Sequence, residues 1–260
     1  MIIYIVLAII LVVIVAYFKS SSVKGRISEQ SIARKLDSNG IFGQCTKTLT
    51  NVYLPKSSGD TAEIDVLHIT TKGILVLENK NYAGYIFGNE ANKIWTVTLY
   101  AGKTWYGGNN VEKHQFYNPI WQNRTHIKHL KEYIGSDIKC FSLITFSNRG
   151  ELKNVSYNSP EVYVCNHSKL SSVLRRICNN NPDILTDKQI EQIYEQLLPL
   201  TNANKEARQK HVTNIQKRFS NTDICPACGG KLVLRTARKG PNTGKQFYGC
   251  SNYPKCKYTR

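Results

Sequence analysis

Three ionisable side chains in the first third of the chain have the types and spacing of a hydrolytic metal site. Asp65 lies in one expected strand, and Glu78 and Lys80 lie two positions apart at the end of the next. Since side chains alternate between the two faces of a strand, Glu78 and Lys80 are expected on the same face of a sheet. Two carboxylates with open coordination positions suit Mg²⁺, a hard ion that keeps water ligands and accepts phosphate oxygens.

These residues could support hydrolysis of a phosphodiester. A cation held by Asp65 and Glu78 would lower the pKa of the attacking water and stabilise charge at phosphorus. Lys80 would position that water or help to deprotonate it. The same three residues also fit a solvated strand end with a weak ion pair, and their spacing alone does not decide between the two interpretations.

Other single donors give weaker signals. His126 and His129 lie three positions apart on one expected helix and could pair as ligands. Because no third donor lies near them in the sequence, we expect surface or packing roles for both. Four cysteines lack paired spacing and are expected to be buried, reduced thiols: Cys45, Cys140, Cys165 and Cys178.

Four cysteines near the C-terminus have the spacing of a structural zinc site. Cys225 and Cys228 form a Cys-x-x-Cys pair, and Cys250 and Cys256 follow after 21 intervening residues. Zinc takes four tetrahedral donors, at about 2.3 Å for sulfur, and a closed set of four thiolates leaves no open position for catalysis. A segment of about forty residues is too small to hold a core unaided, so zinc is expected to supply the folding energy of residues 221–260.

Basic and aromatic residues are interleaved around these cysteines, with Asp223 as the single acid. Cations neutralise phosphates, and flat aromatic rings stack on unpaired bases. Some of the aromatic side chains must fill the small core, so we expect at most two of them to stack on bases. The residues expected to contact DNA are Arg235, Arg238, Lys239, Lys245, Phe247, Tyr248, Tyr253 and Lys257.

The chain begins with an uninterrupted apolar run. From Ile2 to Phe18 no side chain is charged or strongly polar, and 13 of the 17 are Ile, Leu, Val or Phe. A helix of this length spans roughly 26 Å, close to the hydrocarbon core of a bilayer. A cleaved signal peptide is the alternative, but no basic region precedes the run and no small-residue cleavage site follows it.

The charges that flank this run predict an orientation. Positive side chains follow it, beginning with Lys19, and none precedes it. We therefore expect residues 1–19 to be a single-pass anchor in the cell (inner) membrane, with the N-terminus outside and the bulk of the chain in the cytoplasm. Disulfides are unusual in that compartment, which favours metal binding for the paired cysteines.

The overall composition indicates a folded protein that meets a polyanion. Among 260 residues, 35 are Lys or Arg and 18 are Asp or Glu, which gives a formal net charge of +17. A hydrophobic content of 41% excludes wholesale disorder. The positive excess favours nucleic acid or acidic lipid as a partner, without deciding between them.

The elements that must position these residues are those of a mixed α/β domain over residues 25–200, with most strands early. A basic linker or exposed helix at 201–220 separates this domain from the module at 221–260. The expected helices lie around 29–36, 119–134, 168–177 and 186–198, and the expected strands around 46–53, 62–69, 73–77, 93–100, 140–146 and 161–164.

Several of these segments together resemble the nuclease-related domain (NERD), a family similar to the PD-(D/E)xK nucleases. The resemblance covers roughly residues 25–135. It is carried by Gly73-Ile-Leu-Val-Leu-Glu-Asn-Lys-Asn-Tyr-Ala-Gly, by Trp95, and by Asn118-Pro-Ile-Trp-Gln-Asn-Arg-Thr-His126 with Leu130. It implies a restriction-endonuclease-like mixed sheet flanked by helices.

The same resemblance implies roles for individual residues. Asp65 and Glu78 match the metal carboxylates and Lys80 the catalytic lysine. Glu29 matches an early acidic position that adds to the metal site, and Gln122 matches a helical glutamine that contacts the substrate or the metal-bound water. One departure is the asparagine that follows Glu78, where the family usually has an apolar residue; its side chain is expected to point away from the site.

The C-terminal stretches CPACGGKLVLR and FYGCSNYPKCKY resemble the zinc ribbon of bacterial type IA topoisomerases. This resemblance implies binding of single-stranded DNA. It does not imply topoisomerase activity, because 260 residues cannot hold the large catalytic region of such an enzyme. The sequence therefore predicts a membrane-anchored, Mg²⁺- or Mn²⁺-dependent DNA nuclease with one structural Zn²⁺ and no small-molecule cofactor. The alternatives are a catalytically inactive, membrane-tethered DNA-binding protein and a scaffold on a lipid surface.

Overall fold

The computed structural model describes residues 21–38, 40–56, 60–103 and 109–201, and, near the C-terminus, 225, 230–237, 244 and 246–259. The chain divides into two compact units, Met1–Ala203 and Asn204–Arg260. The expected anchor at 1–19 and residues 202–220 of the expected linker lie outside the described residues. Among the helices that are described, none is long and apolar enough to cross a bilayer.

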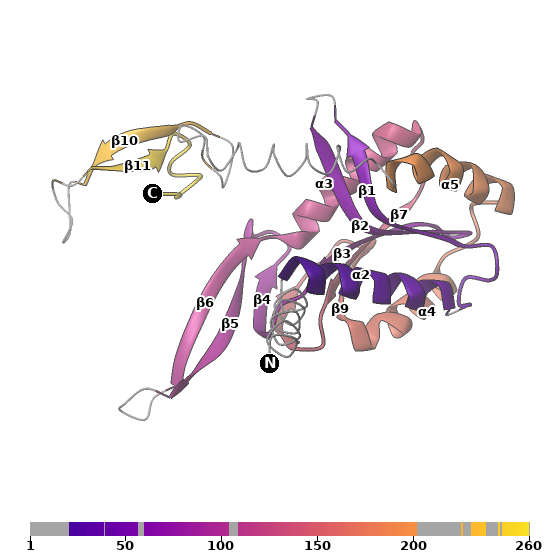
Figure 1. Ribbon diagram of the computed structural model, residues 1–260, viewed down its shortest axis with the longest axis horizontal. Helices are drawn as coiled ribbons and strands as arrows, with labels where there is room; N and C mark the ends of the chain where they lie inside the picture. Colours follow the sequence, from indigo (N-terminus) through magenta and orange to yellow (C-terminus); the bar gives the residue numbers. More distant parts are fainter. Residues whose placement is uncertain are drawn as a thin grey trace, which may run out of the picture. The chain divides into compact units, whose positions relative to one another are not determined.

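The larger unit is built around a five-stranded mixed sheet (Figure 1). The second strand is antiparallel to both of its neighbours, the first and the third, and the last two strands run parallel to the third. The third and fourth strands are buried along most of their length, as expected for strands covered on both faces. In spatial order the strands are β1 (Lys47–Pro55), β2 (Thr61–Thr70), β3 (Gly73–Lys80), β7 (Cys140–Phe146) and β9 (Val162–Asn166).

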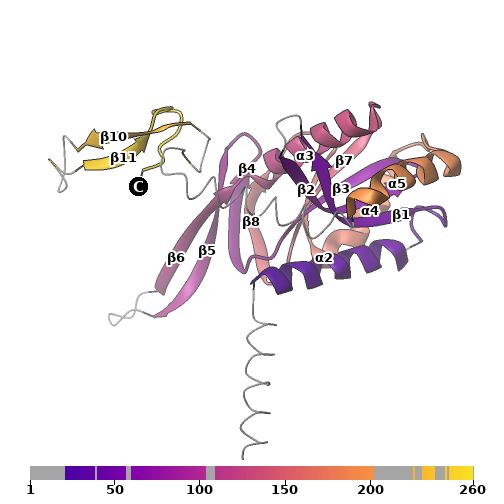
Figure 2. The same ribbon diagram turned by 45° about the horizontal axis from the view of Figure 1, so that its top comes forward.

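Helices cover both faces of this sheet (Figures 1 and 2). One face carries α3 (Pro119–Ile134) and α5 (Asp187–Thr201). The other carries α2 (Ser21–Ser38) and α4 (Leu170–Asn180), the latter after the 3-10 turn η1 (His167–Lys169).

Successive side chains of β3 point alternately toward these two helical layers. Ile74 and Val76 pack with α3 and α5, whereas Leu75 and Leu77 pack with α2 and α4. The same alternation therefore directs Glu78 and Lys80, at the end of β3, toward α3.

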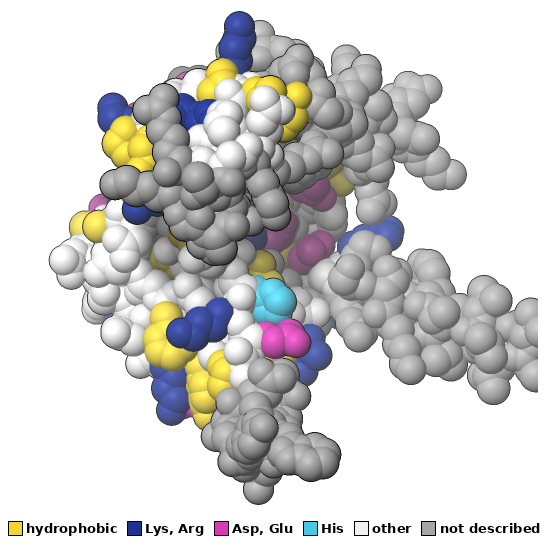
Figure 3. Space-filling model, turned by 90° about the vertical axis from the view of Figure 1, so that its left-hand side faces the viewer, with side chains coloured by type: hydrophobic (Ala, Val, Ile, Leu, Met, Phe, Trp, Pro, Cys, Tyr) yellow, Lys and Arg dark blue, Asp and Glu magenta, His cyan; other side chains and the backbone are white. Residues whose placement is uncertain are grey.

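A second, four-stranded sheet extends the larger unit, in the order β6-β5-β4-β8. One face packs on a cluster around Trp95, Ile120 and Phe146. The other face is open, and hydrophobic side chains such as Tyr85 and Phe87 are exposed on it; Figure 3 shows exposed hydrophobic side chains lying next to Lys and Arg. The strands are β4 (Gly84–Asn89), β5 (Ile94–Lys103), β6 (Asn109–Tyr117) and β8 (Gly150–Ser156).

Only β5 of this second sheet was expected from the sequence; β4, β6 and β8 were not. The expected set of strands, most of them early in the chain, was therefore incomplete. β8, with the sequence GELKNVS, is mostly polar, and β4 contains two glycines in six residues. Glycine and polar residues are depleted in strands, which hid both segments. Tertiary pairing overrides that preference here, because β4 is held between β5 and β8.

Gly88→Ala is expected to destabilise the larger unit by about 1–3 kcal/mol. An added Cβ at this position would lie 2.0 Å from the ring of Trp95, which is fully buried. The matched control is Gly25→Ala in α2, whose Cβ would meet only the Glu29 carboxylate at 3.7 Å and which should stabilise by about 0.5–1 kcal/mol. Urea unfolding followed by tryptophan fluorescence measures both; equal stability of the two variants would contradict the prediction.

The C-terminal unit is a small β-hairpin with its own core. The hairpin pairs β10 (Leu232–Thr236) with β11 (Gln246–Cys250) in an antiparallel register. The described core consists of Leu232 and buried cysteines, with Tyr258 packed against them. So few apolar side chains supply little hydrophobic stabilisation, which agrees with the expectation that metal binding folds this module.

Candidate active site and zinc centre

The two carboxylates of the expected site lie where β2 and β3 separate. Pairing of these strands ends at Val66 and Leu77, just before Asp65 and Glu78 would meet. Asp65 reaches across the opening, and its Oδ2 accepts a hydrogen bond of 2.8 Å from the backbone N–H of Asn79. Asp65 thereby satisfies a backbone donor that the diverging strand leaves unpaired.

Lys80 connects β3 to helix α3. Its Nζ donates to Oε1 of Glu78 at 2.6 Å and to Oε1 of Gln122 at 3.1 Å. Glu78 is buried, with 2% of its surface exposed, whereas Lys80 keeps 19% of its side chain exposed. Lys80 is thus held between two oxygen atoms and remains within reach of solvent.

The structure brings all five expected residues of this site together. Glu29, half-buried on α2, lies close enough for its carboxylate to affect the ionisation of Asp65. Burial raises the pKa of Asp65 well above its usual range, and the carboxylates of Glu78 and Glu29 raise it further. The hydrogen bond from Asn79 and the charge of Lys80 act in the opposite direction.

Lys80 carries the positive charge of the site. Burial would lower the pKa of Lys80, but the carboxylates of Glu78 and Asp65 outweigh burial and raise that pKa above its ordinary value. Lys80 is therefore an ammonium at neutral pH. Its charge lies beside the acidic side chains of Glu78 and Asp65, and Glu29 lies near Asp65.

The donor set fits a divalent cation. Oε2 of Glu78 is buried and has no hydrogen-bond partner among the residues that the structure describes. A buried carboxylate oxygen without a partner is costly, and a cation offsets that cost. Oxygen donors from Asp65 and Glu78, beside solvent-accessible space at Lys80, are the ligands that Mg²⁺ and Mn²⁺ take.

The side chain of Asn79 points to the opposite face of the sheet, as its place between Glu78 and Lys80 predicts. Its Nδ2 donates to Oγ of Ser28 at 3.0 Å. Its Oδ1 accepts from Oγ1 of Thr145 at 3.3 Å and lies 2.8 Å from Nε2 of His167. The amide is thus satisfied on the α2 and α4 side, away from Lys80.

Helix α3 is held in place at its N-terminus. Oδ1 of Asn118 caps the helix by accepting from the backbone N–H of Ile120 at 2.9 Å, and Pro119 occupies the first turn. The Asn118 Nδ2 donates to backbone carbonyls of the β4–β5 turn, including that of Asn92 at 2.7 Å. This anchoring sets the position of Gln122 on the first turns of the helix.

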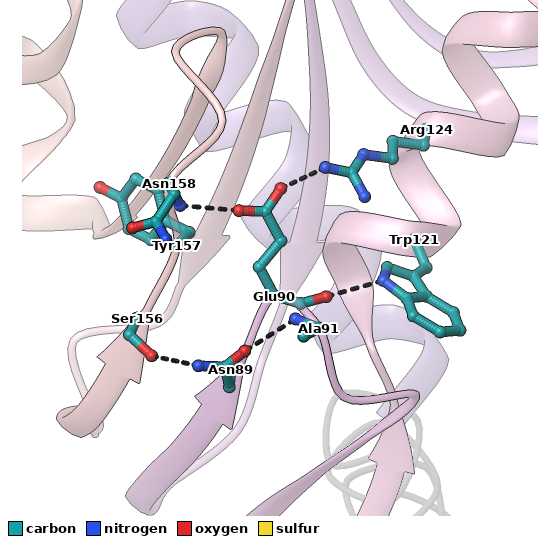
Figure 4. Close-up of a pocket in the computed structure, with 8 residues that line it drawn as sticks. All are labelled: Asn89, Glu90, Ala91, Trp121, Arg124, Ser156, Tyr157 and Asn158. Atoms are coloured by element: carbon teal, nitrogen blue, oxygen red, sulfur yellow. Dashed lines mark hydrogen bonds and ion pairs between the residues drawn. The ribbon is translucent and has the colours of Figure 1, made fainter.

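A pocket of about 320 Å³ beside this helix N-terminus is lined by the β4–β5 turn, α3 and the segment after β8 (Figure 4). Its centre is Glu90, which is ion-paired with Arg124 and accepts from the backbone N–H of Asn158 at 2.7 Å. Burial would raise the pKa of Glu90, but hydrogen bonds from Ser159 and Asn158 outweigh it and lower that pKa. The ion pair and hydrogen bonds around this pocket therefore hold α3 against the β4–β5 turn and the segment after β8. Asp65 and Glu78 do not line the pocket.

His126 is a residue of this site that sequence reasoning missed. It lies one turn after Gln122 on α3, is 8% exposed, and its Nδ1 is 3.6 Å from Oε2 of Glu78. His129, by contrast, lies 3.0 Å from Glu132 on the same helix. The spacing of four between Gln122 and His126 was the available signal, since such residues share a helix face.

Three cysteines form the zinc centre in the described part of the C-terminal unit. Cys225, Cys250 and Cys256 are buried, and their sulfur atoms all lie within 4.8 Å of one another. The sulfur atoms of Cys225 and Cys256 are 3.7 Å apart, and two thiolates on one tetrahedral zinc ion are about 3.8 Å apart. The backbone N–H of Asn252 donates to Cys250 Sγ at 3.4 Å, so these thiols fit zinc. The fourth expected ligand, Cys228, lies outside the described residues.

Next to this centre the structure describes a hollow of about 250 Å³. Arg235 lies over the ring of Tyr253 at 5.8 Å, and Tyr253 is 61% exposed. Tyr248 is also exposed, on β11. Phe247 and Lys257 line the same hollow, whereas the expected contacts Arg238, Lys239 and Lys245 lie outside the described residues.

Two segments of the chain match known families. Residues 24–147 match the nuclease-related domain. Residues 222–260 match the topoisomerase DNA-binding C4 zinc finger. The matched part of the nuclease-related domain contains every residue that converges on Glu78, including His126.

Individual relatives match different shares of this chain. An uncharacterized protein of Bacillus anthracis is 29% identical over 200 residues, which is 76% of this chain and 86% of that protein. DNA topoisomerase 1 of Methanocaldococcus jannaschii is 61% identical over 36 residues, 14% of this chain and 4% of that enzyme. DNA topoisomerase 1 of Helicobacter pylori is 28% identical over 143 residues, 54% of this chain and 17% of that enzyme. No solved structure matches. The chain thus spans only a small part of these topoisomerases.

Proposed function

We propose that this protein is a membrane-anchored, metal-dependent nuclease that hydrolyses DNA and captures it with a zinc ribbon. The observation that carries the proposal is Oε2 of Glu78, which lies beside Asp65 and Lys80. This atom is buried and has no hydrogen-bond partner among the described residues. The nuclease-related domain match and the mixed sheet with helices on both faces support a restriction-endonuclease-like fold. The match to a DNA-binding zinc finger supports DNA as the substrate.

Asp65 and Glu78 would hold Mg²⁺ or Mn²⁺, with Glu29 close by to add negative charge. When bound, the cation would neutralise charge on the phosphate and lower the pKa of the attacking water. The hydrogen bond from the Asn79 backbone to Asp65 keeps one oxygen of that carboxylate fixed and leaves the other to bind. The protein therefore orients the donors before substrate arrives.

Lys80 and Gln122 would act on the phosphate side of the site. The Lys80 ammonium is fixed by Glu78 and Gln122, and 19% of the Lys80 side chain is exposed. From there it can donate to a phosphate oxygen or hold the attacking water, and it stabilises the charge that develops at phosphorus. Gln122 orients Lys80 by accepting a hydrogen bond from its ammonium group.

The zinc ribbon and the anchor would determine where DNA is met. Exposed Tyr253 and Tyr248, together with Arg235, offer stacking surfaces and positive charge that suit single-stranded DNA. Tethering such a module to the nuclease domain raises the local concentration of DNA at the nuclease site. The apolar run from Ile2 to Phe18, followed by Lys19, supports a single-pass anchor with the bulk of the chain in the cytoplasm.

Glu78→Gln tests the nuclease directly. The full-length protein in detergent is incubated with plasmid and single-stranded DNA and with Mg²⁺ or Mn²⁺. We expect cleavage that EDTA stops and that Glu78→Gln slows by about 10²–10³-fold, since an uncharged amide removes a metal ligand. The control is Glu112→Gln, a carboxylate with 59% of its side chain exposed on β6. If wild type binds DNA but leaves it intact with both metals, the protein is instead a DNA-binding protein without nuclease activity.

A further inference from the structure

Two unpaired polar atoms face each other inside the candidate active site. Over the ranges that the structure describes, three buried side-chain atoms have no hydrogen-bond partner: Oε2 of Glu78, Nδ1 of His126 and Oδ1 of Asn123. The first two lie 3.6 Å apart. Unpaired buried polar atoms are uncommon, and two that face each other call for a shared ligand.

The Glu78–His126 contact is not a hydrogen bond. A separation of 3.6 Å exceeds the usual range for one. Burial lowers the pKa of His126 below its ordinary value; Glu78 raises that pKa and Lys80 lowers it again. Oε2 of Glu78 and Nδ1 of His126 are thus both buried without a hydrogen-bond partner among the described residues, which is costly for polar atoms.

The spacing of the two atoms suits one bound cation. With metal–ligand bonds of about 2.1 Å, adjacent ligands of an octahedral ion such as Mn²⁺ lie about 3.0 Å apart. The separation of 3.6 Å between Oε2 of Glu78 and Nδ1 of His126 is about 0.6 Å wider, a difference that small side-chain rotations close. Lys80 already occupies the other oxygen of Glu78, Oε1, so Oε2 is the atom left for metal.

His126 is also held firmly. Its neighbour Asn123 faces the sheet, and the Asn123 Nδ2 donates to the backbone carbonyl of Val76 at 2.7 Å and to Oγ of Ser142 at 2.9 Å. These bonds fix α3 against β3 and β7. The imidazole is therefore positioned for binding before any metal arrives.

We propose that His126 is a metal ligand, so that the site combines the carboxylates of Asp65 and Glu78 with one imidazole and selects Mn²⁺ over Mg²⁺. Mg²⁺ prefers oxygen donors, whereas imidazole binds first-row transition metals more strongly. The inference rests on the proposed function, since it concerns the same cation, and it adds a ligand and a preference that Asp65 and Glu78 alone do not provide.

The test measures metal binding rather than cleavage alone. Full-length protein, with its ribbon loaded with Zn²⁺, is titrated with Mn²⁺ and with Mg²⁺ by calorimetry. Wild type should bind Mn²⁺ at least about tenfold more tightly than Mg²⁺. His126→Ala and the better-filling His126→Gln should each lose about tenfold or more in Mn²⁺ affinity, with a smaller change for Mg²⁺. His114→Ala, which alters an exposed histidine on β6, should leave both affinities unchanged.

Pulsed electron paramagnetic resonance gives a direct signature. Mn²⁺ bound to wild type should show coupling to an imidazole nitrogen, and His126→Ala should abolish it. If both His126 variants lose the preference for Mn²⁺ and the nitrogen coupling, the inference is supported. It is supported even if wild type cuts no DNA, because absence of cleavage would overturn the nuclease proposal alone. DNA cleavage with unchanged Mn²⁺ affinity and nitrogen coupling in these variants would overturn the inference alone.

Discussion

Lys80→Met is expected to slow DNA cleavage about a thousandfold while DNA binding stays close to that of wild type. The substitution keeps the length of the side chain but removes the ammonium that Glu78 and Gln122 hold in place. A fixed charge aimed at the transition state is worth about 10²–10³-fold in rate, and loss of proton transfer adds to that. Single-turnover cleavage at saturating metal isolates the chemical step.

Metal affinity separates this role from a structural one. Lys80 places a positive charge 2.6 Å from Glu78, which disfavours a second cation nearby. Lys80→Met should therefore bind Mn²⁺ as tightly as wild type or more tightly, while it cuts far more slowly. The control is Lys153→Met, which removes a half-exposed lysine paired with Glu151 on β8. A drop in metal affinity as large as the drop in rate would contradict the assigned role.

Cys250→Ser is expected to unfold the C-terminal unit and to leave the larger unit folded. Structural zinc in small modules supplies about 10–16 kcal/mol of apparent binding energy, and that energy is folding energy. The described core of this unit has few apolar side chains besides the cysteines themselves, chiefly Leu232 and Tyr258. Without the metal, this core is too small to keep β10 and β11 paired.

Three measurements check this second prediction. Bound zinc should fall from one equivalent to near zero, proteolysis should remove the C-terminal residues, and DNA affinity should decrease together with its salt dependence. Wild type stripped of zinc by a chelator should behave like the variant. The matched control is Cys45→Ser, a half-buried free cysteine near the start of β1. Retention of both zinc and DNA affinity by Cys250→Ser would rule out the proposed zinc centre.

Strong local patterns explain which elements sequence analysis predicted well. β3 and β7 are mostly apolar, and α3 follows Asn118, begins at Pro119 and ends before Gly135, so short-range rules located all three elements. β3 nevertheless continues three residues beyond its expected end, to Lys80. β4 and β8 escaped detection because pairing with neighbouring strands, rather than composition, makes them strands. The second sheet, which extends the larger unit beside α3, was therefore absent from the expected architecture.

His126 illustrates the same limit at the level of a single side chain. Helical periodicity places His126 on the face of Gln122 but does not reveal what lies opposite that face. Because no third donor lies near it in the sequence, a surface or packing role was expected. The structure shows instead that its Nδ1 faces the unpaired oxygen of Glu78.

The sequence by itself determined the donors and their local geometry. Glu78 and Lys80 share a face because strands alternate, and the paired cysteine spacing identifies a zinc ligand set, since both rules act over a few residues. Only the tertiary structure decided that Asp65 bonds to the Asn79 backbone, that Lys80 meets Gln122, and that His126 faces Glu78. These contacts join different strands and helices. Their geometry depends on how strand separation and helix packing fit together, which no local pattern encodes.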